Sequence, residues 1–340
     1  MPSSIAAPRI TDGPLTDLAE FVISGGEIDL DTATALLRLP TERAYDLMYA
    51  AYLVKRHFLG DQLHRCGIVN IKSGNCGEDC GFCAQSVFWQ KEAGTPTYGL
   101  MSTDQMVDAA RESVDHGATN FGLVAAWKGI KKGPQLDQIC DAIKRIKAEG
   151  RVLPDVSLGV AGPEEMAQLK DAGCVVYHHN LETSSSYYSQ VCTTRPWQEN
   201  YDTIKHAKAA GMEVCCGGIF GMGENMRQRA EFMLEIRSLR PEHVPLNFLV
   251  SVHGTPLAGK QDIKPLEALM LIAVFRLTNP TSDIFVAGGR IQNLRQLQPF
   301  LFMAGANGMM VGNYLTTPGR TREMDIELVA DLGLDGAIHG

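Results

Sequence analysis

Short apolar runs alternate with amphipathic stretches along most of this chain. The apolar runs have the length and the flanking turn residues of buried strands. Eight of them are recognised, at 68–72, 120–125, 155–160, 175–180, 213–218, 244–250, 284–288 and 308–311. The stretches between them have the pattern of helices with one buried face, at 103–116, 136–148, 164–172, 198–210, 225–239, 265–277 and 294–304. Several of these stretches open at a capping residue or Pro and end near Gly.

Eight strand and helix alternations over about 250 residues predict a (β/α)8 barrel of the TIM type, within the α/β class. A doubly wound open parallel sheet is the structural alternative. Further helical stretches precede the first strand, at 15–24, 30–37 and 42–57. The predicted organisation is an N-terminal helical extension at 1–60, the barrel at 61–325 and a C-terminal tail at 326–340. In such a barrel, chemistry belongs at the carboxyl ends of the strands.

The amino-acid composition limits the kinds of molecule that this chain can bind. The chain has 340 residues, of which 45% are apolar and 21% charged, and its formal net charge is -8. An acidic balance opposes nucleic-acid binding, which depends on Lys and Arg neutralising phosphates. No apolar stretch has the length of a signal peptide or a membrane span. Nine cysteines, an odd number, indicate reduced thiols with ligand or redox roles. We expect a cytoplasmic enzyme that acts on a small molecule, with no nucleic-acid or membrane partner.

Three of these thiols, Cys76, Cys80 and Cys83, lie on a glycine-rich loop directly after the first predicted strand. Their C-x3-C-x2-C spacing allows each thiolate to bind one iron of a 4Fe–4S cluster. The fourth iron then has no protein thiolate and is open to chelate a ligand, as in catalytic metal sites with three protein ligands. A structural zinc site with His64 or Cys66 as fourth ligand is the alternative, but zinc ribbons use paired C-x2-C motifs.

This loop, with Phe82 before the third cysteine, resembles the cluster loop of the radical S-adenosylmethionine superfamily. There, the cluster passes an electron to S-adenosylmethionine, giving methionine and a 5′-deoxyadenosyl radical that abstracts hydrogen from substrate. Further runs make the chain similar to the biotin synthase family from about residue 45 to 335. These runs are 124–128, 177–184, 193–195, 215–224, 245–250, 254–257, 287–290, 304–307 and 315–317.

The resemblance implies insertion of sulfur into dethiobiotin by two hydrogen abstractions, each using one S-adenosylmethionine. The sulfur would come from a second, auxiliary iron–sulfur cluster deeper in the barrel. In the common form of the family that cluster is 2Fe–2S and is held by three cysteines and one arginine. The resemblance also implies an electron donor such as flavodoxin or ferredoxin, and a homodimer.

The auxiliary site departs from the family pattern. Gly122 and Asp155 stand where the family has its first two auxiliary cysteines, whereas Cys215 and Arg290 match its third cysteine and its arginine. One thiolate would leave a 2Fe–2S cluster badly under-ligated, because such clusters take four protein ligands. The site has therefore been lost or rebuilt.

Rebuilding would use thiols elsewhere in the barrel. Cys66 lies at the start of the first strand, and Cys174 begins the fourth predicted strand, with the side-chain parity of the inward positions that follow it. The hypothesis is an auxiliary cluster of different composition, ligated by Cys66, Cys174, Cys215 and Arg290. Cys192, on the loop after the fourth strand, is the next candidate.

Arg290 and the extra cysteines could also have ordinary structural roles. Arg290 could form an ion pair with Asp155. The extra cysteines could be small buried hydrophobes, as free cysteines usually are. We expect Cys140 to be a core residue of its helix and Cys216 to face the helices.

For S-adenosylmethionine the resemblance implies Asn180 and Glu182, the latter in place of the usual aspartate. A carboxylate can accept hydrogen bonds from both ribose hydroxyls. Arg195 offers a guanidinium fork to the methionine carboxylate, with a surface ion pair as its alternative role. The implied cofactor-binding residues are Phe82, Asn180, Glu182, Arg195, Gly218 and Ile219.

For dethiobiotin the resemblance implies Asn247, whose amide can both donate to and accept from the ureido ring. His178 replaces an asparagine expected to share that task. Thr316 and Thr317 would receive the substrate carboxylate. Each residue could instead be an ordinary turn residue at a strand end.

Two other functions remain open at this point. One is a different radical enzyme on the same scaffold, such as a hydrogenase-cofactor maturation protein or a carbon-skeleton mutase. The other is a non-catalytic metal or electron carrier.

Overall fold

The computed structural model describes residues 14–260, 263–311 and 319–334. Parallel strands form its centre, in the order β5-β4-β3-β2-β1-β9-β8-β7-β6. Their bounds are β1 (His64–Lys72), β2 (Asn120–Ala125), β3 (Leu153–Ser157), β4 (Val176–His178), β5 (Glu213–Cys215), β6 (Gly218–Phe220), β7 (His243–Phe248), β8 (Asp283–Val286) and β9 (Gly308–Met310). β5 and β6 are two parts of one interrupted strand, and both pair with β7. The sheet therefore closes into the predicted eight-stranded barrel.

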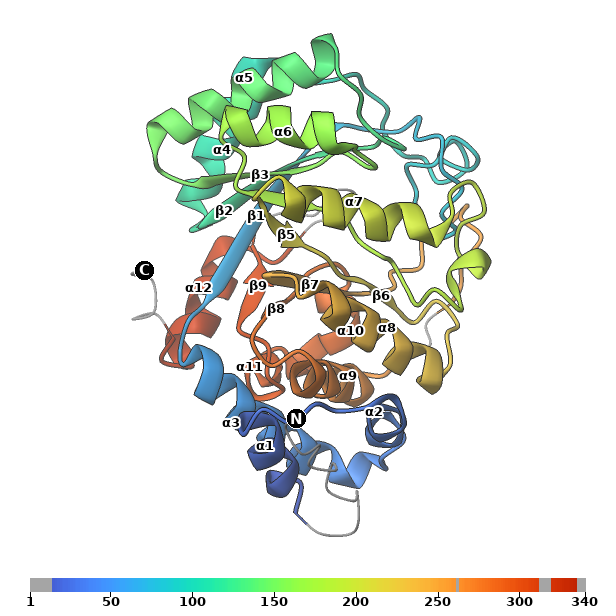
Figure 1. Ribbon diagram of the computed structural model, residues 1–340, viewed down its shortest axis with the longest axis vertical. Helices are drawn as coiled ribbons and strands as arrows, with labels where there is room; N and C mark the ends of the chain where they lie inside the picture. Colours follow the sequence, from blue (N-terminus) through green and yellow to red (C-terminus); the bar gives the residue numbers. More distant parts are fainter. Residues whose placement is uncertain (1–13, 261–262, 312–318, 335–340) are drawn as a thin grey trace.

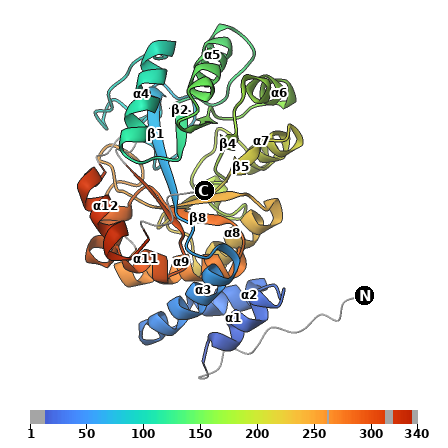
Figure 2. The same cartoon turned by 90° about the vertical axis from the view of Figure 1, so that its left-hand side faces the viewer.

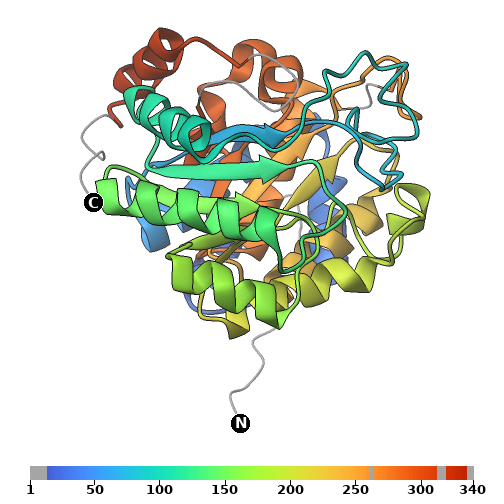
Figure 3. The same ribbon diagram turned by 90° about the horizontal axis from the view of Figure 1, so that it is seen from above.

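Helices surround the barrel on its outside (Figures 1 and 3). They are α4 (Thr103–Asp115), α5 (Pro134–Glu149), α6 (Pro163–Ala172), α7 (Trp197–Ala209), α8 (Met226–Leu239) and α9 (Pro265–Thr278). Local signals explain their ends. Ser102 and Gln105 form a capping box at α4, and Gly150 and Gly173 end α5 and α6 in the left-handed conformation. The main core fills the layer between these helices and the strands.

The predicted N-terminal helices lie at one side of the barrel (Figure 2). They are α1 (Thr16–Ile23), α2 (Leu30–Leu37) and α3 (Ala44–Leu59), the last preceded by a short 3-10 turn at Thr41–Arg43. α3 packs on α9, and α2 packs on α8 and α9. The extension thus covers helices of the second half of the barrel.

The region after β8 differs from the prediction of one helix at 294–304. It holds α10 (Arg290–Leu294), a 3-10 turn (Arg295–Leu297) and α11 (Phe300–Met303). Arg295 adopts a φ of 50°, which no continuous helix permits. A further helix, α12 (Arg322–Asp331), includes the predicted boundary between residues 325 and 326.

The barrel interior has its own packed cluster, separate from the main core. It is formed by side chains from five strands, those of Phe285 and Ala287 coming from β8 and its end: Cys66, Val176, Cys215, Phe285, Ala287 and Met310. Below it lies a polar layer in which the His64 and His243 rings stack at 4.8 Å between centroids, and His243 lies 3.3 Å from Asp283. The interior therefore contains titratable groups as well as apolar ones.

Arg276 on α9 is fully buried behind the strands. Its guanidinium donates to the carbonyls of Gly305 (2.7 Å) and Ser282 (2.8 Å) and to the side-chain oxygen of Asn307 (2.9 Å). Asn307 Oδ1 also accepts from the backbone N–H of Ile284 at 2.8 Å. One side chain therefore joins α9, the start of β8 and the turn before β9.

We expect Arg276→Met to destabilise the chain by about 3 kcal/mol or more, because it leaves several buried acceptors without a donor. Urea unfolding of the cluster-free chain would measure the change. Arg145→Met is the matched control, since Arg145 pairs with Asp104 in solvent and should cost less than about 1 kcal/mol. Equal shifts of the two unfolding midpoints would contradict this role.

Candidate active site

A cavity of about 400 Å³ opens at the carboxyl ends of the strands. Cys76, Cys80 and Cys83 line one side of it, on the loop that leaves β1. His178 and Asn247 line it from β4 and β7. This loop lies at the end of the barrel to which the strand arrows point (Figure 3). The predicted cluster loop therefore lies where a barrel places its chemistry.

The three loop thiols are free and close enough to affect one another. Burial raises the pKa of Cys83 to about 11, and the neighbouring Cys76 thiol contributes to that rise. The loop is held by a hydrogen bond from Cys83 N–H to the Cys80 carbonyl (2.9 Å) and by another from the Ser86 hydroxyl to the Glu78 carbonyl (2.6 Å). Three convergent thiols on one cavity wall fit a 4Fe–4S cluster with one iron left open.

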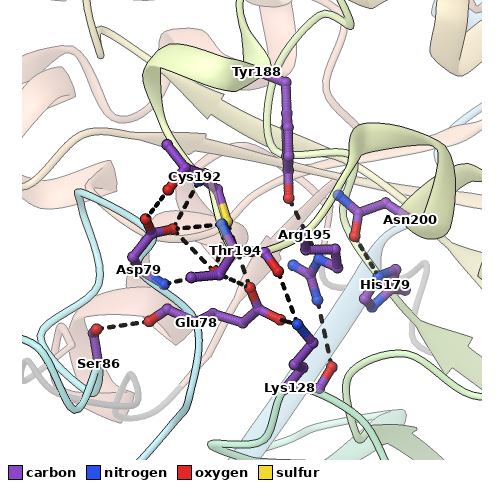
Figure 4. Close-up of polar contacts among 11 residues, drawn as sticks. Glu78, Asp79, Ser86, Lys128, His179, Tyr188, Cys192, Thr194, Arg195 and Asn200 are labelled. Atoms are coloured by element: carbon purple, nitrogen blue, oxygen red, sulfur yellow. Dashed lines mark hydrogen bonds and ion pairs between the residues drawn. The ribbon is translucent and has the colours of Figure 1, made fainter.

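A polar network ties this loop to the loop after β4 (Figure 4). The hydroxyl of Thr194 donates to the carboxylate of Glu78, and Asp79 accepts from the backbone N–H groups of Thr193 (2.8 Å) and Thr194 (3.1 Å). The Lys128 ammonium lies 3.4 Å from Glu78 and also donates to the Thr194 carbonyl at 2.8 Å. Sequence analysis missed Glu78, Asp79 and Lys128 as site residues.

Cys192 belongs to this loop pair and not to the second cluster for which it was the next candidate. It packs with Cys80 and Tyr188. Its sulfur lies 3.5 Å from the Thr194 hydroxyl and 3.6 Å from the Glu78 carboxylate. A hydrogen bond with the Cys80 thiol is the main cause that lowers the pKa of Cys192 to about 6. It lies beside Asp79 and Thr194, where the two loops meet (Figure 4).

Asn180 and Glu182 lie together after β4. The Asn180 amide donates to the Glu182 carboxylate at 3.4 Å and accepts from Gly217 N–H at 3.1 Å. Burial raises the pKa of Glu182 to about 7. Glu182 adopts a φ of 68°, and a Cβ at Gly218 would lie 2.3 Å from its carbonyl oxygen. Only glycine permits this approach.

Arg195 and Phe82 complete this side of the cavity. Arg195 is 7% exposed, so its alternative role in a surface ion pair is wrong. Its guanidinium lies 3.4 Å from the Tyr188 hydroxyl and 3.5 Å from the Lys128 carbonyl. Ile219 lines the same cavity from β6.

The predicted substrate residues are only partly described. Asn247 accepts from Gly288 N–H (2.8 Å) and donates to the Gly218 carbonyl (3.1 Å), which fixes its amide at the cavity wall. One amide hydrogen and one lone pair remain for a ligand. His178 lies 3.5 Å from Asp155. Thr316 and Thr317 lie outside the described residues.

The structure brings together two of the four residues predicted to hold the auxiliary cluster. Cys66 and Cys215 pack in the barrel interior. Cys174 instead belongs to the layer between strands and helices, where its thiol donates to the Val176 carbonyl at 3.3 Å. The predicted parity fails because β4 begins only at Val176, and side-chain alternation holds only within a strand.

Arg290 also points away from the interior. It lies on α10, where its guanidinium pairs with Asp325 of α12 at 2.8 Å and approaches the Met309 sulfur at 3.3 Å. Met309 packs in the layer outside the barrel. The ligand role expected for Arg290 therefore does not fit its position, and Asp325 is its ion-pair partner where Asp155 was expected.

Of the remaining thiols, Cys140 and Cys216 lie in the main core, as expected. No described helix is long and apolar enough to cross a membrane.

Comparisons with known proteins agree with this geometry. Residues 70–236 match the family model "Radical SAM superfamily", and residues 245–335 match "Biotin and Thiamin Synthesis associated domain". The biotin synthase of Geotalea daltonii is 46% identical over 95% of this chain and 98% of its own length. That of Geobacter sulfurreducens is 48% identical over 93% of this chain and 96% of its own length. The chain belongs to the biotin synthase family.

Two solved structures support the fold. Methylornithine synthase superposes with a TM-score of 0.79 at 18% identity, over 94% of this chain and 96% of its own. The FeFe-hydrogenase maturase of Carboxydothermus hydrogenoformans gives 0.76 at 17% identity, over 94% of this chain and 78% of its own. The family implies a 4Fe–4S cluster, S-adenosylmethionine and an auxiliary iron–sulfur cluster. The expected barrel of the radical S-adenosylmethionine superfamily is thus confirmed.

We expect the pKa of Glu182 to make the cluster-free chain less stable as pH rises. Because the folded pKa is raised from 4.5 to about 7, the unfolded chain loses its proton first. The stability contribution of the protonated group is complete below pH 4.5 and is lost as pH rises through 7. Glu182→Gln should therefore gain stability relative to the native chain between pH 5 and pH 8 in urea unfolding. An unchanged difference across that range would contradict the assignment.

Proposed function

We propose that this chain converts dethiobiotin to biotin, using S-adenosylmethionine and two iron–sulfur clusters. The observation that carries the proposal is the single cavity shared by the three-thiol loop and by polar groups of the opposite strands. The family membership of the chain supports the same substrate.

The mouth of the cavity suits the first cluster and S-adenosylmethionine. Cys76, Cys80 and Cys83 would hold three irons, and the fourth would take the amino and carboxylate groups of the methionine moiety. Arg195, held by Tyr188, would bind that carboxylate through its fork. When bound, these groups supply the electron transfer and the hydrogen abstraction typical of the superfamily.

The side of the cavity toward β6 suits the nucleoside. Glu182 can accept from both ribose hydroxyls, and Asn180 orients that carboxylate. Ile219 lines the cavity here and would contact the adenine. Gly218 beside it has no side chain, which lets the Glu182 backbone approach this strand. Phe82 lines the same space beside the cluster thiols.

The far wall suits dethiobiotin. Asn247 would pair with the ureido ring through the donor and the acceptor that its backbone contacts leave free. Thr316 and Thr317 would bind the carboxylate. The auxiliary cluster would supply the sulfur from the floor of the cavity, below His178. On family resemblance we add an electron donor of the flavodoxin or ferredoxin class, a homodimer and a cytoplasmic location.

Anaerobic reconstitution with iron and sulfide tests the function. With S-adenosylmethionine, a reductant and dethiobiotin, we expect biotin and 5′-deoxyadenosine together by mass spectrometry. Cys76→Ala should abolish both products, because it removes one cluster ligand.

Cys140→Ala is the matched control, since this thiol is buried in α5 outside the barrel, and both products should persist. Deoxyadenosine without biotin would keep the radical chemistry and refute the substrate. Absence of both products in the native chain, with its cluster intact, would refute the radical function.

A further inference from the structure

Four polar or thiol side chains converge inside the barrel on the floor of the cavity. The Cys66 sulfur, a carboxylate oxygen of Asp155 and a ring nitrogen of His178 all lie within 4.8 Å of one another. Cys215 packs with Cys66 in the same interior cluster. The strands β1, β3, β4 and β5 each contribute one member, so the arrangement is set by the barrel itself.

The strand register explains the convergence. Asp155 pairs with Gly122 on one side and with Val176 on the other, and His178 pairs with Cys215. Gly122 contributes no side chain to this interior. Of the two positions that lack the family's thiols, Gly122 therefore leaves space and Asp155 supplies a carboxylate.

This group contains a buried carboxylate with few hydrogen-bond partners. Asp155 is 1% exposed, and its Oδ1 has no hydrogen-bond partner in the described part of the chain. His178 Nε2 reaches the other oxygen only at 3.5 Å. Burying a carboxylate oxygen without a partner is costly, and such an atom requires an explanation, of which a bound ion or ligand is one.

The location also suits a reaction at the cavity floor. His178, Phe285 and Met310 line the cavity, and the last two pack directly on Cys66 and Cys215. A group held by these four residues would therefore lie between the substrate space and the lower polar layer of the barrel.

The lower layer is a weaker candidate for the same role. His64, His243 and Asp283 also lie within 4.8 Å of one another. Their groups already contact one another, and His243 further pairs with Glu213 at 3.0 Å. None of the three lines the cavity, whereas His178 of the upper group does.

We propose that Cys66, Cys215, Asp155 and His178 are the protein ligands of the auxiliary cluster, with a carboxylate and an imidazole in place of two thiolates. The assignment rests on the proposed function for the existence of that cluster. Imidazole can replace cysteine on iron, as in Rieske centres, where two histidines replace two cysteines. A carboxylate oxygen is likewise an ordinary iron ligand. Cys174 and Arg290 have no part in this set.

Spectroscopy of the auxiliary cluster alone gives the sharpest test. The full chain carrying Cys76→Ala, Cys80→Ala and Cys83→Ala would be reconstituted with iron-57 and sulfide, so that the first cluster cannot form. With nitrogen-15 histidine, pulsed electron paramagnetic resonance of the reduced cluster should show a directly bound histidine nitrogen. His178→Gln should remove that coupling. A cluster with no histidine coupling in the parent chain would overturn the assignment, whatever the variants do.

Iron and sulfide analysis of variants tests the role of the Asp155 carboxylate and provides a control. In the otherwise native chain, Asp155→Asn should lose the iron of the auxiliary cluster and keep that of the first, whereas Asp155→Cys should retain both. Cys174→Ala, a thiol removed from the outer layer, should retain both clusters. Loss of auxiliary iron in Cys174→Ala but not in Asp155→Asn would refute the ligand set.

These measurements need no dethiobiotin. A chain that binds the auxiliary cluster through histidine but forms no biotin would support the ligands and refute the function. A chain that forms biotin without a histidine coupling would do the reverse.

Discussion

Closure of the barrel at an interrupted strand is the constraint on which the site depends. β5 ends at Cys215, β6 begins at Gly218, and both halves must pair with β7. A Cβ at Gly217 would lie 2.0 Å from the Pro245 carbonyl oxygen, so only glycine allows β7 to approach. The Gly217 N–H donates a hydrogen bond to the side-chain oxygen of Asn180. The residues that close the barrel therefore also shape the side of the cavity that we propose for the nucleoside.

The cysteines of the two proposed cluster sites are held in different ways. The first three thiols lie on a loop, and their positions depend on long-range hydrogen bonds such as that between Thr194 and Glu78. Cys66 and Cys215 lie on strands, where backbone pairing fixes each side chain on both sides. A radical precursor that must bind and leave suits a loop at the mouth. A sulfur donor that must meet one carbon atom suits the rigid interior.

Local patterns predicted the elements well and the side-chain directions less well. The strand at 120–125 and the helix at 30–37 have the predicted bounds, because the apolar run of the one and the Asp29 cap of the other are local signals. Cys174 was placed inward by parity, which fails because it lies two residues before β4 begins. Arg290 was placed by resemblance at a ligand position, but it follows β8 on a separate short helix. Its partner Asp325 belongs to a helix that was not predicted.

In the candidate site, too, local features were predictable from the sequence and long-range contacts were not. The spacing of Cys76, Cys80 and Cys83 is a local signal, so it was readable from the chain alone. The approach of Cys66 to Asp155 and His178 joins three strands far apart in sequence, and no local pattern records it. From the sequence, Asp155 was interpreted as a missing cysteine or as an ion-pair partner of Arg290, and not as a ligand. Once the barrel closes, that carboxylate is buried with an unpaired oxygen beside a thiol. An apparent loss of a ligand is therefore better explained as its replacement.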